Sequence, residues 1–221
     1  MNESVEIFNW TLSKAQIVIE VLAIMAFALS GLIEAARHKL DAVGVFVAAG
    51  LTAFGGGTLR DLLIDRRPFF WVEHYYWLWV LLLVGLAAMA FMRSHTLELT
   101  EKAMQWPDAL GLGLFAASGT QLALVAEMPA LVAVLMGMMS AVTGGVLRDI
   151  VVNEIPRAFS DYRPYAVCAF LGGWVVVLGE AVGLNSTVTL VTAAGVTIAL
   201  RGAALLTDYR LPEWRKEREN R

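Results

Sequence analysis

Charged residues, cysteine and histidine are all scarce in this chain of 221 residues. Charged residues make up 17% of it, against about a quarter in soluble domains. The formal charge of −3 is too small to indicate a nucleic-acid partner. The single cysteine, Cys168, excludes an intramolecular disulfide and is expected to be a small buried hydrophobe. His38, His74 and His95 show no metal-ligand spacing, so we expect neither a metal site nor a cofactor.

Long apolar runs make up most of the chain. Hydrophobic residues make up 58% of the chain, and its mean hydropathy is +0.63. A helix needs about 20 apolar residues to cross a bilayer. Seven runs approach that length, at about 15–36, 42–64, 72–92, 107–126, 130–152, 165–184 and 187–206. The sequence therefore predicts an all-α membrane protein, with a single transmembrane domain over 1–206 and a charged cytoplasmic tail over 207–221.

Lysine and arginine positions predict the orientation, because short cytoplasmic loops of membrane proteins are enriched in both residues. With the N-terminus in the periplasm, only Lys14, Arg66 and Arg67 lie on the periplasmic side. The opposite orientation would place most of the lysine and arginine residues on the periplasmic side. We therefore expect a multi-pass inner-membrane protein with a periplasmic N-terminus and a cytoplasmic C-terminus. The residues then on the cytoplasmic side are Arg37, Lys39, Arg93, Lys102, Arg157, Arg163, Arg201, Arg210, Arg215, Lys216, Arg218 and Arg221.

An internal repeat relates the two halves of the chain. The segment 53–61, Ala-Phe-Gly-Gly-Gly-Thr-Leu-Arg-Asp, returns at 141–149 as Ala-Val-Thr-Gly-Gly-Val-Leu-Arg-Asp, an offset of 88 residues. The same offset aligns 27–31 with 115–119 and Pro68 with Pro156. Each unit, about 15–92 and 107–184, holds three expected helices, so the second enters the membrane from the opposite side. We therefore predict two inverted three-helix repeats plus a seventh helix at 187–206, an architecture typical of transporters and pores.

Each copy of the motif places small residues one helical turn before its charges. Residues four apart share a helix face, so the first copy has one stripe of Thr52, Gly56 and Arg60 and a second of Gly57 and Asp61. The matching residues of the second copy are Ser140, Gly144, Arg148, Gly145 and Asp149. The favoured interpretation is two broken or kinked helices that line a polar path with freed carbonyls. Close helix packing through small residues is the alternative.

The charged residues themselves admit two interpretations. Arg60 and Asp61 are neighbours that point about 100° apart on a helix, so we expect each to find its partner elsewhere. They either line the path or form a structural salt bridge that holds the bundle together. Glu34, Glu180 and Arg201 are weaker candidates for the path, and Arg201 is expected to extend toward the membrane interface.

Enzymatic chemistry is not indicated. No nucleophile–base pair stands out, and the run Gly55–Gly57 is not a phosphate-binding loop because no strand precedes it. We therefore expect that the protein is not an enzyme.

At the paired Gly-Gly-x-x-Arg-Asp segments, 56–61 and 144–149, the sequence resembles the trimeric intracellular cation channel family. The likeness is to its prokaryotic members, many of which are also catalogued as glycine transporters, and it covers about residues 15–206. It implies a homotrimer in which each protomer carries its own pore for potassium or sodium between the second and fifth helices. It also implies that Arg60, Asp61, Arg148 and Asp149 lie beside that path. The residues that it implicates in bending the helices are Gly55, Gly56, Gly57, Gly144 and Gly145.

The second motif departs from the first at Thr143, which stands where Gly55 stands in the first copy. The animal channels carry a lysine in their second glycine segment, and this chain has none between Met128 and Leu147. The regulation linked to that lysine is therefore not expected here.

Two functions fit these residues. In a channel for monovalent cations, the hydroxyls of Thr52, Ser140 and Thr143 would replace water around a dehydrating ion. In a carrier for glycine or another small zwitterion, an arginine would bind the carboxylate and an aspartate the amine. A scaffold or lipid-handling protein is a third possibility. Membrane lipid is the expected surrounding and a candidate ligand in each case.

Overall fold

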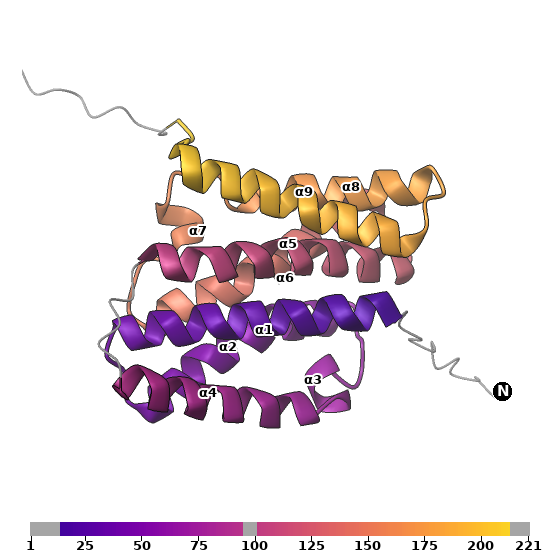
Figure 1. Ribbon diagram of the computed structural model, residues 1–221. Coiled ribbons are helices and arrows are strands. Elements are labelled where there is room, and N and C mark those ends of the chain that lie inside the picture. The colour runs from indigo at the N-terminus through magenta and orange to yellow at the C-terminus, as the bar shows by residue number, and fades with distance from the viewer. Residues whose placement is uncertain (1–13, 95–100, 213–221) are drawn as a thin grey trace, which may run out of the picture.

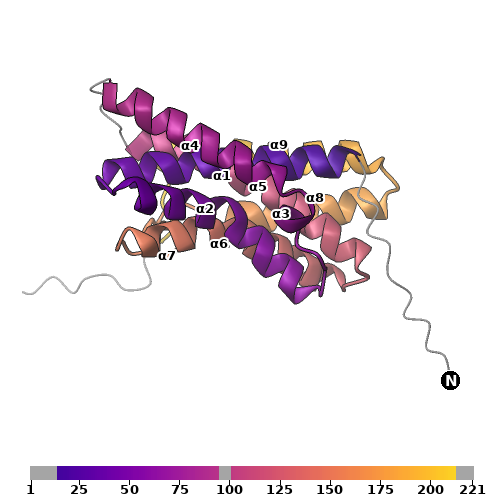
Figure 2. The same cartoon turned by 90° about the horizontal axis from the view of Figure 1, so that it is seen from below.

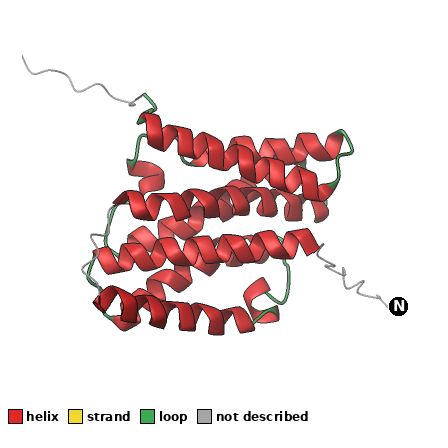
Figure 3. Ribbon diagram, in the orientation of Figure 1, coloured by secondary structure: helices red, strands yellow, loops and turns green. Residues whose placement is uncertain are grey.

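The computed structural model describes residues 14–94 and 101–212, which form a bundle of helices (Figure 1). All regular structure in this described part is helical (Figure 3). The helices in chain order are α1 (Lys14–Arg37), α2 (Ala42–Leu63), α3 (Phe70–Glu73), α4 (Tyr76–Ser94), α5 (Glu101–Val125), α6 (Ala130–Val151), α7 (Arg157–Ser160), α8 (Ala166–Ala181) and α9 (Ser186–Thr207).

Five of these helices, α1, α2, α5, α6 and α9, are long and apolar enough to cross a membrane. Helices α4 and α8 are apolar over the shorter stretches Tyr76–Ala87 and Ala166–Ala181. Large apolar side chains such as Leu22, Leu83 and Val191 are exposed on the outer faces, as lipid contact requires. The prediction of an all-α membrane protein is confirmed.

Element boundaries differ from the sequence expectation in two places. The run expected at 72–92 is divided into the single turn of α3 and the long helix α4, which begins at Tyr76. The run expected at 107–126 begins earlier, at Glu101, and Pro107 lies inside α5. A search for apolar runs does not find the true start of α5, because the first residues of this helix are polar. The charged tail expected at 207–221 lies largely outside the described residues.

Helix α5 lies at the centre of the bundle. It packs against α1, α6, α8 and α9, and 78% of its most apolar window is buried. Helices α2 and α6 pack directly against each other, and Figure 2 shows them side by side. The two short helices α3 and α7 lie at opposite ends of the bundle (Figure 1). The α2–α6 contact therefore lies within the bundle, and the short helices α3 and α7 lie at the bundle's two ends.

Helix ends and core contacts repeat at the offset of 88. Helices α2 and α6 both end before a residue with left-handed backbone, Asp65 at φ 51° and Asn153 at φ 60°. Aspartate and asparagine tolerate that conformation better than most residues do. In the core, the ring of Phe27 in α1 packs against that of Phe115 in α5, tilted by 35° and with ring centroids 5.3 Å apart. Cys168 is buried in the same apolar cluster, as predicted.

Candidate functional site

The contact between α2 and α6 is made by the two glycine motifs. A Cβ atom at Gly56 would fall on the carbonyl oxygen of Ser140, far inside van der Waals contact. A Cβ atom at Gly144 would likewise overlap the carbonyl oxygen of Thr52, somewhat less deeply. Thr52 and Ser140 are themselves related by the offset of 88. Each motif thus presses its glycine against the backbone of the other, and no other residue fits at either position.

The predicted interruptions of the two helices are wrong, whereas a kink at the glycines stays a prediction. Helix α2 continues as α-helix through Gly55–Gly57, and α6 continues through Thr143–Gly145. A helix interruption inside a bilayer leaves backbone groups without partners, at several kcal/mol each. A glycine in an intact helix costs only about 1 kcal/mol. The close approach of α2 and α6 therefore explains the glycines, as the packing alternative proposed.

Around Arg60 the structure builds a fully buried ionic cluster. The Arg60 guanidinium donates to Glu20 at 2.5 Å and to Asp61 at 2.7 Å, and reaches the Ser118 hydroxyl at 3.4 Å. Ser118 in turn donates to Glu20. None of the four side chains is more than 1% exposed. We call these residues, Glu20, Arg60, Asp61 and Ser118, the Arg60 cluster.

A second cluster, again with one arginine, two carboxylates and one serine, surrounds Arg148. Its guanidinium donates to Asp108 at 2.5 Å, to Asp149 at 2.9 Å and to the Ser30 hydroxyl at 2.6 Å. Arg148 is 2% exposed and Asp108 4%. We call Ser30, Asp108, Arg148 and Asp149 the Arg148 cluster.

The two clusters correspond residue by residue. Adding 88 to the numbers of Glu20, Arg60 and Asp61 gives Asp108, Arg148 and Asp149, while Ser30 plus 88 gives Ser118. Each arginine therefore takes both acids from its own half of the chain and its serine from the other half. The halves are tied together reciprocally, through equivalent contacts in both directions.

Two sequence expectations about these charges need correction. Arg60 does bond to its neighbour Asp61, and Arg148 to Asp149, because the long arginine side chain folds back along the helix. The remaining partners, Glu20 and Asp108, were not identified from the sequence. The offset of 88 would have found them, because it aligns these two acids in otherwise apolar runs.

Asp61 and Asp149 are buried, as predicted, and each caps the short helix that follows it. Asp61 accepts the Phe70 amide at 3.1 Å, and Asp149 accepts the Arg157 amide at 2.8 Å. Helices α3 and α7 are thereby held over the ends of α2 and α6. Each aspartate thus links an arginine to the turn that closes one end of the bundle.

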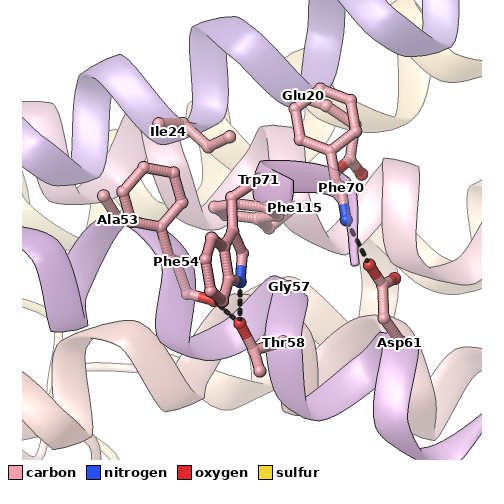
Figure 4. Close-up of a pocket in the computed structure, with 10 residues that line it drawn as sticks. All are labelled: Glu20, Ile24, Ala53, Phe54, Gly57, Thr58, Asp61, Phe70, Trp71 and Phe115. Carbon is pink, nitrogen blue, oxygen red and sulfur yellow. Dashed lines mark hydrogen bonds between the residues drawn. The ribbon is translucent and has the colours of Figure 1, made fainter. Parts of the chain in front are cut away.

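A small cavity lies beside the Arg60 cluster, under α3 (Figure 4). Its volume of about 10 Å³ is close to the minimum that holds one water. Glu20, Gly57 and Asp61 contribute to its wall. Trp71 covers it and donates from its indole to the Thr58 hydroxyl at 3.0 Å, as the dashed line in Figure 4 marks.

The other predicted polar residues lie at or near the α2–α6 contact. Thr52 is buried and donates to the Ala48 carbonyl, and Ser140 is buried without a hydrogen-bond partner. Gly145 faces the Tyr165 hydroxyl. Thr143 and Gly55 lie on the opposite side of the contact and line an open apolar groove of about 660 Å³. The structure therefore brings Thr52, Gly56, Ser140 and Gly144 together and leaves Thr143 apart.

The three weaker candidates lie away from the α2–α6 contact. Glu34 pairs with Arg37 and with Arg157 of α7, both at 2.6 Å. Glu180 is exposed and accepts from Gln121.

Arg201 does not extend outward as expected, because its side chain is 3% exposed and donates to Pro164 and Asp161. Burial raises the pKa of Asp161, but hydrogen bonds from Arg163 and the charges of Arg163 and Arg201 outweigh it and hold that pKa below its usual range.

The fold and its buried charges define a membrane protein built from two related halves. The sequence model of the family described as "Glycine transporter" matches the chain twice, at residues 17–93 and 105–181. The first residues of the two matches are 88 apart, and so are their last residues, which confirms the internal repeat. The chain belongs to this family.

Known proteins resemble the chain over most of its length. The inner membrane protein YadS of Escherichia coli K12 is 31% identical, over 92% of this chain and 98% of its own. The TRIC trimeric intracellular cation channel orthologue from Rhodobacter sphaeroides matches with a TM-score of 0.81 and 30% identity, over 89% of this chain and all of its own. A structure described as explaining conductance through TRIC cation channels matches with a TM-score of 0.78 and 33% identity, over 90% and 97%. The predicted resemblance to prokaryotic TRIC channels is confirmed.

Proposed function

We propose that the protein is a channel for potassium or sodium, with one pore in each protomer between α2 and α6. The observation that carries the proposal is the contact of Gly56 and Gly144 with the facing backbones, flanked by two buried arginine clusters. Charges are costly at membrane depth and are usually found where an ion or substrate passes. The likeness to solved TRIC cation channels supports the same function.

In the proposed architecture the two halves are inverted three-helix repeats, formed by α1, α2 and α4 and by α5, α6 and α8. Helix α9 is the seventh crossing. The N-terminus is periplasmic, so that the α3 end faces outward and the α7 end inward. The reciprocal serine contacts of the two clusters support this arrangement, because a twofold axis between the repeats generates such pairs.

The structure corresponds to a closed pore in this proposal. No ion could pass between Gly56 and the Ser140 carbonyl while the two are in contact. Separation of α2 from α6 would open the path and expose the hydroxyls of Thr52 and Ser140 to it. Asp61 and Asp149 then draw cations toward the two ends, and the neighbouring arginines limit the flow.

Assembly as a homotrimer is part of the proposal. It is supported by the trimeric relative from Rhodobacter sphaeroides. Lipid surrounds the trimer and fills apolar grooves on its surface.

The second candidate is a carrier for glycine or another small zwitterion. The specific observation in its favour is an arginine with two acids in each cluster, which can bind a carboxylate and an amine together. The description of the matching family supports it as well. In the structure, however, both arginines are already saturated by their own carboxylates, which favours the channel.

Purified protein in planar bilayers separates the two functions. A channel gives discrete unitary currents in KCl, whereas a carrier gives none and instead exchanges labelled glycine across liposomes. Glycine exchange without unitary currents would replace the channel by the carrier.

A further inference from the structure

The open apolar groove of about 660 Å³ runs along one side of the α2–α6 contact. Its α2 wall includes Leu51 near the middle of the helix and Leu62 near the end. Thr143 and Leu147 form its α6 wall. A volume of this size is typical of pockets that hold a ligand. We call it the α2–α6 groove.

The α2–α6 groove has the depth of one membrane leaflet. Leu51 and Leu62 are 11 positions apart. That spacing corresponds to about 16 Å along an α-helix, and half of a bilayer's hydrocarbon core is about 15 Å thick. Helix α2 is long and apolar enough to cross that core. The groove therefore leads from the middle of the membrane to its surface at the α3 end, a course that suits an acyl chain.

Trp71 forms the wall of the groove at the α3 end, and its side chain is held in place. The indole donates to Thr58 at 3.0 Å, and its ring packs against that of Phe54 with centroids 6.3 Å apart. All three side chains line the groove, and Figure 4 shows them together. Tryptophan is enriched where the hydrocarbon core meets the headgroups. This wall therefore marks the level at which an acyl chain would join its headgroup.

An exposed cation lies beyond that wall. The guanidinium of Arg67 lies 4.6 Å from the centre of the Phe69 ring, which in turn stacks on Trp71 at 6.2 Å. The Arg67 side chain is 57% exposed, and its partner Asp65, 3.9 Å away, is 95% exposed. A pair of this kind contributes little, so a phosphate group can take the guanidinium instead. The equivalent position at the α7 end is Ile155, an apolar residue.

We propose that the α2–α6 groove binds one acyl chain of an anionic phospholipid from the leaflet at the α3 end, and that Arg67 holds the phosphate. A second copy of the protein is the other occupant that an apolar groove would suit. A protein partner, however, requires neither the depth of one leaflet nor a cation at the groove's end. The proposal does not depend on whether the protein is a channel or a carrier.

The first test is native mass measurement after purification in equal amounts of phosphatidylglycerol and phosphatidylcholine. The unmodified protein should retain one phospholipid for each protomer. Leu51→Trp fills the groove from α2 and Thr143→Trp fills it from α6, so each should lose most of the bound lipid. Leu200→Trp is the matched control on α9, because Leu200 is 38% exposed and Leu51 37%. It should retain the lipid.

The second test concerns the headgroup. A charge pair about 4 Å apart in water is favoured about fivefold, so the retained lipid should be phosphatidylglycerol by about that ratio. Arg67→Gln should bring the ratio toward one while the lipid count stays the same, and Arg67→Lys should keep the ratio. Arg210→Gln is the matched control, because Arg210 is 64% exposed and also pairs with an aspartate two residues earlier, Asp208. It should leave the ratio unchanged.

A third measurement does not depend on how well these variants fold. Phosphatidylglycerol with a photoreactive group in its acyl chain should label α2 and α6 of the unmodified protein, and labelling confined to other helices would overturn the proposal. Equal lipid retention by Leu51→Trp and Leu200→Trp would also overturn it. If Leu51→Trp instead separates the subunits and keeps its lipid, a second copy covers the groove and the proposal fails. Equal retention of the two lipids by the unmodified protein would refute the role of Arg67.

Discussion

Alanine at Gly56 should force α2 and α6 apart. The added Cβ atom would overlap the Ser140 carbonyl, which is backbone and cannot turn aside as a flexible side chain can. Overpacking of this kind costs about 1–3 kcal/mol in protein interiors. Alanine also favours a helix over glycine by about 1 kcal/mol, which would hide part of the loss.

Gly50→Ala is the control that removes this second effect. Gly50 lies on the same helix, and a Cβ atom there meets nothing within 4 Å. Both substitutions gain the same helix propensity, so the difference between them isolates the clash. For a chain of this size, each kcal/mol shifts the melting temperature by roughly 2–4 °C. We therefore expect Gly56→Ala to melt several degrees below Gly50→Ala in detergent.

The same pair of variants tests the closed state in bilayers. If contact at Gly56 closes the pore, a helix separation of one methyl group should raise the open probability relative to Gly50→Ala. Equal melting temperatures for the two variants would refute the close contact. A lower melting temperature with unchanged gating would keep the contact and refute its role as a gate.

The remaining predictions concern charge, topology and assembly. Asp61→Asn or Asp149→Asn should lower unitary cation conductance, and Arg60→Ala or Arg148→Ala should raise it or alter gating. If all four only reduce protein yield, the clusters are structural salt bridges, whose disruption costs about 3–5 kcal/mol. A reporter active only in the periplasm and fused after Arg221 should be silent, and activity there would reverse the orientation. Native mass measurement in detergent should give a trimer, and a monomer or dimer would contradict it.

The sequence predicted the fold class and the repeat because membrane insertion leaves strong one-dimensional signals. Long apolar runs and the ungapped offset of 88 are visible without knowing any contact. The burial of Asp61 and Asp149 followed from the cost of a charge facing lipid. The partners Glu20 and Asp108 were missed, because each lies 40 residues from its arginine in sequence and only the offset of 88 relates the two acids.

Helix continuity was the other failure, and its cause is specific to membranes. In water, three successive glycines such as Gly55–Gly57 would favour an interruption, since freed backbone groups are solvated. In a bilayer those groups have no water, so an intact helix is favoured even at a cost of about 1 kcal/mol for each glycine. The same glycines then let two intact helices approach to backbone contact.

The glycines and the arginine clusters are both consequences of the close α2–α6 contact. Gly56 and Gly144 bring the backbones of α2 and α6 into contact, which closes the centre of the bundle. Charges beside such a contact are shielded from bulk water, so each arginine is paired with acids of its own half. The serine contacts between the halves, from Ser30 to Arg148 and from Ser118 to Arg60, are the parts of the clusters that a separation of the halves would strain. Hydrogen bonds to a charged group contribute only about 1.5–3 kcal/mol each. In the proposed channel, the ion pairs within each half stay intact while these two bonds exchange for water, so that the closed state would be stable yet able to open.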